Sequence, residues 1–246
     1  MHHELEQVDV GWDTASWRGR RTVNADAVAS RYDPVNGESV FAVADGVGDT
    51  PEAANAAQLA ANAAVETTAR DGVIKAILAA RQAVASGTGD CVLVVAMPFA
   101  DRTGGGYRIA WVGDCRAYLW DQRTLRLLTT DQTVAAYLRS RGRPTTVRME
   151  HIVTNTVATT TVDRIGWTQV RTADAGLLLA TDGVHKIVPT FMAHRELLRA
   201  EQPAHALTRV AAMLGGRDNA TALVVDRAGG HGVMTQPTVH AVAAAS

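Results

Sequence analysis

The sequence predicts an α+β protein whose sheets are largely antiparallel. Apolar strands occur in runs joined by short turns, and helical segments occur in pairs between those runs. A chain built from βαβ units would instead alternate strand and helix. The 246 residues can form one large domain or two small ones.

The first half of the chain begins with one buried strand, VFAVAD at 40–45, which is apolar up to its final aspartate. Residues 52–69 have an alanine-rich helical composition, and residues 73–85 form a second expected helix. A glycine turn is expected at 102–106. This turn lies within a run of three expected strands: 91–97, 107–113 and 116–121.

The second half begins with an expected strand at 125–129 and a short helix at 133–142, which ends at Gly142 before Pro144. Residues 143–165 are rich in Thr and Val and give no clear pattern. A strand, a helix with glycines favourable for its C-cap and a last strand follow: 175–182, 204–214 and 220–227.

Composition argues against several classes of protein. The net charge of −1 does not indicate wholesale binding to nucleic acid or anionic membranes. No apolar run reaches the ~18 residues of a membrane span. Two cysteines are too few for a disulfide scaffold, and no signal peptide is visible, so we expect a cytoplasmic protein. We expect one domain over 1–228 and a flexible tail over 229–246.

Aspartates stand where apolar runs meet polar turns: Asp26, Asp45, Asp114, Asp182 and Asp218. Three of the adjoining strands are strongly apolar, so their ends should lie together in one core. Several acids there would repel one another, and a cation resolves the repulsion. Ligation by Asp alone favours Mg²⁺ or Mn²⁺ over Zn²⁺.

Each aspartate taken alone also fits an ordinary turn. Asp-Gly is a hairpin signal, and Asp-Asn favours turns. The number of similar strand ends makes a metal site plausible, but their spacing by itself leaves both interpretations open.

Five segments together resemble a known family. RTVNADA, FAVADGVGD, WVGDCRAYLW, LLLATDGV and GGRDNATALVV are similar, in order and spacing, to the motifs of PP2C-type (PPM) metal-dependent serine/threonine protein phosphatases of the compact bacterial type. The resemblance runs from about residue 10 to 227. It implies a four-layer α-β-β-α sandwich of two mainly antiparallel sheets flanked by helix pairs.

The resemblance also implies two Mg²⁺ or Mn²⁺ ions at one end of the sandwich. Asp45 would bridge the two ions, and Asp182 and Asp218 would complete the shell of the first. The carbonyl of Gly46 would bind the second ion, with Asp26 reaching it directly or through water.

Two further residues match functional positions of that family. Asp114 matches the acid of a third, weaker metal position. Arg21 matches the arginine that holds the substrate phosphate, since a guanidinium can bind phosphate oxygens bidentately. We therefore expect Arg21, Asp45 and Asp182 to be catalytic.

The activity implied is hydrolysis of phosphoserine and phosphothreonine by a hydroxide that bridges the two ions. The implied partners are phosphoproteins of bacterial signal transduction, such as a serine/threonine kinase or its substrates. Nothing in the sequence demands an oligomer, so we expect a monomer.

The sequence departs from the family pattern at several positions. Lys186 stands where many members carry an acid: it would weaken the third ion by repulsion, stand in for that cation, or face solvent. Ala25 replaces a polar residue that often precedes the first aspartate. Val47 stands where some members have a histidine. His185 is the histidine nearest in sequence to an expected ligand, and a lone histidine is more often structural.

Residues 131–166 lie where the family has its flap over the site.

Two functions other than a protein phosphatase stay open. One is a pseudophosphatase that binds a partner without turnover, which Lys186 favours and the retained acids oppose. The other is a hydrolase of the same fold that acts on a non-protein phosphoester.

Overall fold

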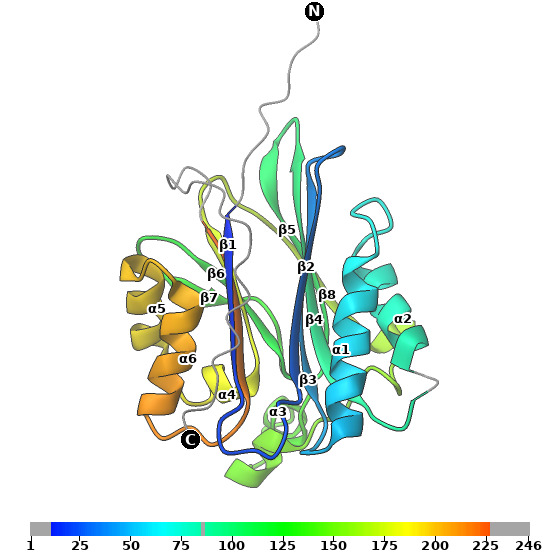
Figure 1. Ribbon diagram of the computed structural model, residues 1–246, viewed down its shortest axis with the longest axis vertical. Helices are drawn as coiled ribbons and strands as arrows, with labels where there is room; N and C mark the ends of the chain where they lie inside the picture. The colour runs from blue at the N-terminus through cyan, green and yellow to red at the C-terminus, as the bar shows by residue number, and fades with distance from the viewer. Residues whose placement is uncertain (1–10, 85–86, 227–246) are drawn as a thin grey trace, which may run out of the picture.

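The computed structural model describes residues 11–84 and 87–226. Two five-stranded sheets lie face to face, and every strand pairing in them is antiparallel (Figure 1). The first sheet has the order β1 (Trp12–Trp17), β10 (Ala220–Val225), β9 (Gly176–Ala180), β6 (Arg116–Trp120), β7 (Leu125–Leu127). The second sheet has the order β2 (Asp26–Asp33), β3 (Glu38–Gly46), β4 (Cys91–Asp101), β5 (Gly104–Val112), β8 (Gly166–Arg171).

Helices cover both outer faces. The helices α1 (Pro51–Val65) and α2 (Val73–Val84) lie on the second sheet, and α5 (Thr190–Arg199) and α6 (Pro203–Met213) lie on the first (Figure 1). The short helices α3 (Val134–Arg139) and α4 (Asp182–His185) lie at one end of the sandwich (Figure 1). The expected α-β-β-α architecture is therefore confirmed. The predicted tail at 229–246 lies outside the described residues.

The strands supply two faces because successive side chains point to opposite sides. In β3, Phe41 and Val43 pack in the core between the sheets, whereas Ala42 and Ala44 face the helix pair. The same alternation in β9 sends Leu179 inward and Leu178 toward α6. A strand that is covered on both faces needs apolar residues at successive positions, which explains the continuously apolar runs in the sequence.

Helix α1 lies close to the second sheet because its buried face is made of alanine. The Thr50 hydroxyl accepts a hydrogen bond from the Ala53 amide, and Pro51 takes the first helical position, where its missing N–H costs nothing. The helix ends at Val65 rather than residue 69, because the Thr pair after Glu66 has low helix propensity.

Other boundaries also differ from the expectation. β4 continues past Pro98, because β3 pairs with it only as far as Ala96 and the missing proline amide breaks no ladder bond. The strand expected to reach 182 ends at Ala180, and Asp182 begins α4 instead. The expectation missed three strands and one longer helix: β1, β2, β8 and α5.

None of the helices in residues 11–84 and 87–226 combines the length and the apolar character that crossing a membrane requires. Two 3₁₀ turns, η1 (Val147–His151) and η2 (Val162–Arg164), occur in the segment that the sequence left without a pattern.

The tight packing of α1 predicts that it will not accept a larger side chain on its buried face. Ala57 is fully buried, so Ala57→Leu should lower the free energy of unfolding by about 1–3 kcal/mol through overpacking. Gln58→Leu is the matched control, because residue 58 of the same helix is exposed. Denaturant titration of both variants measures the difference, and equal stabilities would contradict the close packing.

Candidate functional site

Strand register brings two of the predicted acids together in the second sheet. Asp26 begins β2 and lies directly opposite Asp45 near the end of β3. Gly46 follows and lies so close to α1 that a Cβ atom would stand 2.5 Å from the Ala53 carbonyl oxygen. The Asp-Gly pair is thus both the end of a strand and a close backbone approach, which places the Asp45 carboxylate at the end of the sandwich.

The first sheet brings the other three acids to the same end. Asp114 lies two residues before Arg116 and Asp182 lies two residues after Ala180, and Arg116 and Ala180 are paired in the β6–β9 ladder. Asp218 lies two residues before β10 begins. The charges of all four other acids raise the pKa of Asp45, after burial itself as the largest cause. The structure therefore gathers all five predicted acids.

Two buried polar residues that the sequence analysis did not assign hold this arrangement. The Asn219 side chain accepts a hydrogen bond from the Ala25 amide at 2.8 Å, and donates to the carbonyls of Arg18 at 2.7 Å and Val23 at 3.0 Å. The Thr181 hydroxyl donates to Asp26 at 2.8 Å and accepts from the Thr221 amide at 2.9 Å. Asn219 was visible only as half of an Asp-Asn turn signal.

Arg21 lies at the site but already has an acidic partner. Its Nη2 donates to Asp218 Oδ2 at 2.7 Å, and this hydrogen bond is the main reason that the pKa of Arg21 is raised. The expected phosphate-binding residue and an expected metal ligand therefore form an ion pair. Both side chains are partly exposed, at 40% and 35%.

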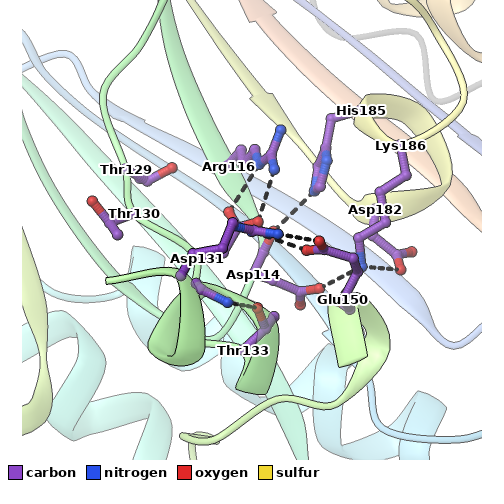
Figure 2. A network of polar contacts seen from close by, with 12 residues as sticks. Asp114, Arg116, Thr129, Thr130, Asp131, Thr133, Glu150, Asp182, His185 and Lys186 are labelled. Atoms are coloured by element: carbon purple, nitrogen blue, oxygen red, sulfur yellow. Dashed lines mark hydrogen bonds and ion pairs between the residues drawn. The ribbon is translucent and has the colours of Figure 1, made fainter. Parts of the chain in front are cut away.

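Lys186 is not a solvent-facing residue. Its ammonium lies 2.8 Å from Asp114 Oδ2 and 3.0 Å from Asp182 Oδ2, and it also donates to the Glu150 carbonyl at 3.0 Å (Figure 2). Burial raises the pKa of Asp114, and Lys186 only partly offsets that effect. Burial also acts to raise the pKa of Asp182, but His151 and Lys186 outweigh it and leave this pKa well below its usual range.

Asp26 and Asp45 are left without a positive partner in the described part of the chain. Asp26 Oδ1 is buried and accepts no hydrogen bond there. The pKa of Asp26 is raised, first by burial and then by the charges of Asp182 and Asp218. A half-buried carboxylate pair of this kind is costly when both members are ionised.

The donor set fits a hard divalent cation at this pair, since it offers only oxygen and one orphaned carboxylate atom. At the other acids a metal ion would compete with the protein's own cations. Within residues 11–84 and 87–226, no three His, Cys, Asp or Glu side chains are placed so that they hold one metal ion as they stand. The metal-binding role of the Gly46 carbonyl stays a prediction.

Among the histidines and cysteines near the site, His151 is exposed, whereas the others have structural positions. His185 Nε2 lies 2.9 Å from the Asp114 carbonyl, which can only accept, so Nε2 carries the proton and His185 is structural. His151, on η1, is the exposed histidine of the site, with Nδ1 3.5 Å from Asp182. Cys91 and Cys115 are free thiols buried in the core.

The segment 131–166 covers this end of the sandwich through several contacts. Gln132 accepts a hydrogen bond from the Gly113 amide through its side chain and donates to the Gly113 carbonyl through its own amide, both at 2.9 Å. Asn155 donates to the Gln132 side chain at 2.9 Å. Lys186 links this segment to the acids, because its ammonium contacts both the Glu150 carbonyl and the carboxylates of Asp114 and Asp182.

Removing the Asn219 side chain should disturb both stability and the position of Arg21. Asn219→Ala leaves one amide and two carbonyls without partners, so the free energy of unfolding should fall by about 2–4 kcal/mol. Asn36→Ala is the control, because Asn36 is exposed and bonds only within its turn. Chemical denaturation compares the two, and a small effect at both positions would contradict the scaffold role.

His185 predicts a specific pH dependence. Burial, with Arg116 nearby, lowers its pKa to about 4 in the folded protein, below the value of about 6.5 expected when unfolded. Between these values only the unfolded chain binds the proton, so stability is complete above pH ~6.5 and is lost as pH falls toward 4.

His185→Gln keeps a donor for the Asp114 carbonyl but does not titrate. Between pH 7 and pH 4 the wild type should therefore lose about 3 kcal/mol more stability than the variant. Acids without an electrostatic interaction with His185 titrate alike in both proteins and cancel in the difference, whereas Asp131 and Asp182 interact with it. Parallel stability curves would show that His185 is protonated in the fold.

Solved bacterial serine/threonine phosphatases share this fold. PstP/Ppp of Mycobacterium tuberculosis is 24% identical, with a TM-score of 0.73 over 88% of this chain and 98% of that chain. Stp1 of Staphylococcus aureus is 21% identical, with a TM-score of 0.77 over 92% and 98%. The S. agalactiae serine/threonine phosphatase is 18% identical, with a TM-score of 0.78 over 88% and 99%.

The catalytic domain of PstP, at 24% identity and a TM-score of 0.73, has been solved in complex with 2 manganese ions. No protein-family model and no curated protein sequence matches the chain. The fold that the motifs predicted is confirmed: the chain has the fold of the bacterial PPM/PP2C serine/threonine phosphatases.

Proposed function

We propose that the chain is a metal-dependent phosphatase that hydrolyses phosphoserine and phosphothreonine in proteins. The observation that carries the proposal is the Asp26–Asp45 pair, which is half-buried at the end of the sandwich and has no cationic partner among the described residues. The fold shared with serine/threonine phosphatases and the manganese ions of the PstP domain support it. Cytoplasmic phosphoproteins, including a kinase or its substrates, would be the partners of a monomeric enzyme.

The oxygens of Asp45, Asp26 and the Gly46 carbonyl are the ligands we assign to Mg²⁺ or Mn²⁺. Asp182 would join them through Oδ1, since Lys186 and His151 contact its Oδ2. Asp218 would join them by exchanging Arg21 for metal. Two bound ions would lower the pKa of water and stabilise negative charge on the phosphoryl group. The acids of the site outnumber their paired cations Arg21 and Lys186, which favours cation entry.

Arg21 would bind the substrate phosphate. Only its Nη2 contacts Asp218, and a phosphate dianion offers the guanidinium two oxygens where the carboxylate now takes one bond. Because Arg21 is partly exposed, it can turn from one partner to the other. Its pairing with Asp218 keeps the guanidinium at the site when no phosphate is bound.

A departing serine or threonine alkoxide must be protonated. His185 cannot serve, since its pKa is lowered and its one proton is held by the Asp114 carbonyl. His151 has the opposite properties: it is 53% exposed, and its pKa is raised chiefly by Asp182. We assign the proton donor to His151.

A binding module without turnover is the second candidate function. The observation in its favour is that Arg21 and Lys186 already occupy three of the five acids, which is how a protein could retain this fold without metal. The two candidates differ in what the Asp45 carboxylate does. An enzyme needs it, whereas a binding module does not.

The test is hydrolysis of p-nitrophenyl phosphate and a phosphothreonine peptide with Mn²⁺, Mg²⁺ or EDTA. Turnover should require metal and should fall at least ~100-fold in Asp45→Asn, because this carboxylate is the central ligand. The metal-free variant should also unfold at a higher temperature than the wild type, increasingly so as pH rises, since the neutral amide removes the repulsion that raises the pKa of Asp45.

Asp33→Asn is the matched control, because Asp33 ends the same strand that Asp26 begins and lies at its far end. It should retain full activity. Metal binding without turnover in the wild type, with either substrate, would favour the binding module.

A further inference from the structure

Lys186 is surrounded in a way that is unusual for a lysine. Its ammonium has three N–H groups, and three oxygens take them: Asp114 Oδ2, Asp182 Oδ2 and the Glu150 carbonyl, all at 2.8–3.0 Å (Figure 2). The side chain is only 16% exposed, and the two carboxylates are 6% and 14% exposed. All the hydrogen-bonding capacity of the ammonium is therefore used within the site.

Two carboxylates and a backbone carbonyl are also the ligands that a hard divalent cation takes in proteins. Without a positive charge among them, Asp114 and Asp182 would be two poorly solvated carboxylates that face each other. The ammonium performs the electrostatic part of a metal ion's role here. It is tethered to the chain, so it is present in every folded molecule.

We propose that Lys186 is a built-in cation: its ammonium takes the place between Asp114 and Asp182 that a diffusible divalent ion would otherwise occupy, and through the Glu150 carbonyl it fastens η1 over the site. The inference rests on the proposed function only in assigning Asp26 and Asp45, not Asp114, to the metal ions of the reaction.

The choice of residue supports this role. The chain has only two lysines, Lys75 and Lys186, and many arginines. A planar guanidinium directs its N–H groups outward in a fork, whereas an ammonium is a point charge that can address three oxygens around one centre. Lys186 directly follows α4 and is four residues from Asp182, so one helical turn brings the ammonium back to that carboxylate.

The contact with Glu150 couples the charge to the covering segment. Arg139 of α3 forms an ion pair with the Glu150 side chain, and the Val134 amide donates to the Ile152 carbonyl at 2.8 Å. These contacts join η1 to α3, while Lys186 joins η1 to the acids. Loss of the ammonium should therefore release one side of the segment 147–151.

The first experiment counts bound Mn²⁺ by isothermal titration calorimetry and equilibrium dialysis. Lys186→Ala, which removes the charge and leaves space, should bind one more ion per chain than the wild type. Lys75→Ala is the matched control, because Lys75 pairs with Asp71 at 3.0 Å on an exposed helix face. Lys186→Arg keeps the charge and should bind no additional ion.

The second experiment measures tryptic cleavage after the exposed Arg148 in metal-free protein, with fragments identified by mass spectrometry. Lys186→Ala and Lys186→Arg should both be cleaved about 10-fold faster than the wild type and Lys75→Ala, because both lose the three-way contact. Saturating Mn²⁺ should restore protection in Lys186→Ala. If that variant does not fold, Lys186→Gln preserves the stem and serves in both experiments.

Equal Mn²⁺ numbers in Lys186→Ala and wild type would overturn the cation substitution, and equal cleavage rates would overturn the fastening of η1. Both experiments compare Lys186 variants with the wild type and measure no phosphatase activity, so their outcome does not depend on the proposed function. A wild type that binds no Mn²⁺ would contradict the metal-dependent phosphatase, whereas one extra ion in the variant would still support the built-in cation.

Discussion

Mutual repulsion among five carboxylates is the constraint on which this end of the molecule depends. The sheets bring Asp26, Asp45, Asp114, Asp182 and Asp218 to one edge of an apolar sandwich, where solvent screens charge poorly. The protein offsets part of this repulsion with cations from three separate segments: Arg21, His151 and Lys186. The offset stops short of Asp26 and Asp45, and the remaining imbalance is what a bound metal ion would relieve.

The fold tolerates such a site because its stability lies elsewhere. Three apolar layers bury the strands on both faces, and the alanine face of α1 brings that helix close to the second sheet. At the site itself, Asn219 fixes the backbone through neutral hydrogen bonds that do not depend on ionisation, and the Thr181 hydroxyl joins Asp26 to the Thr221 amide. Rigid neutral supports around repelling acids are what a metal site needs if it is to keep its shape before the metal arrives.

The sequence predicts the parts of this structure that depend on local pattern. The central strands are readable because β3, β4 and β9 are apolar on both faces, and the acids at their ends are readable as interruptions of those runs. β2 and β8 were missed because each mixes polar residues with apolar ones, as edge strands do. α5 was missed for a similar reason, since only two of its residues are buried.

The pairings within the site could not be predicted in the same way. Lys186 reaches Asp114, which is 72 residues away, and Arg21 reaches Asp218, which is 197 residues away. Sequence pattern indicates that each side chain is near the edge of the sandwich, but which carboxylate a given cation meets depends on sub-ångström details of loop packing. The motif resemblance assigned Arg21 to phosphate and Asp218 to metal separately, and so it did not indicate that the two neutralise each other.

These ion pairs determine which carboxylates a metal ion could bind without first displacing a cation of the protein. Arg21 and Lys186 hold their acids in place through bonds of 2.7–3.0 Å, so an incoming divalent ion would meet carboxylates that are already oriented. An ion bound by Asp26 and Asp45 would displace no cation of the described residues, whereas an ion that recruits Asp218 would have to release Arg21. Arg21, once released, would then be available for a phosphate dianion at the same edge. Metal binding and phosphate recognition would thus be coupled through one carboxylate, because the arginine cannot serve Asp218 and the substrate fully at once.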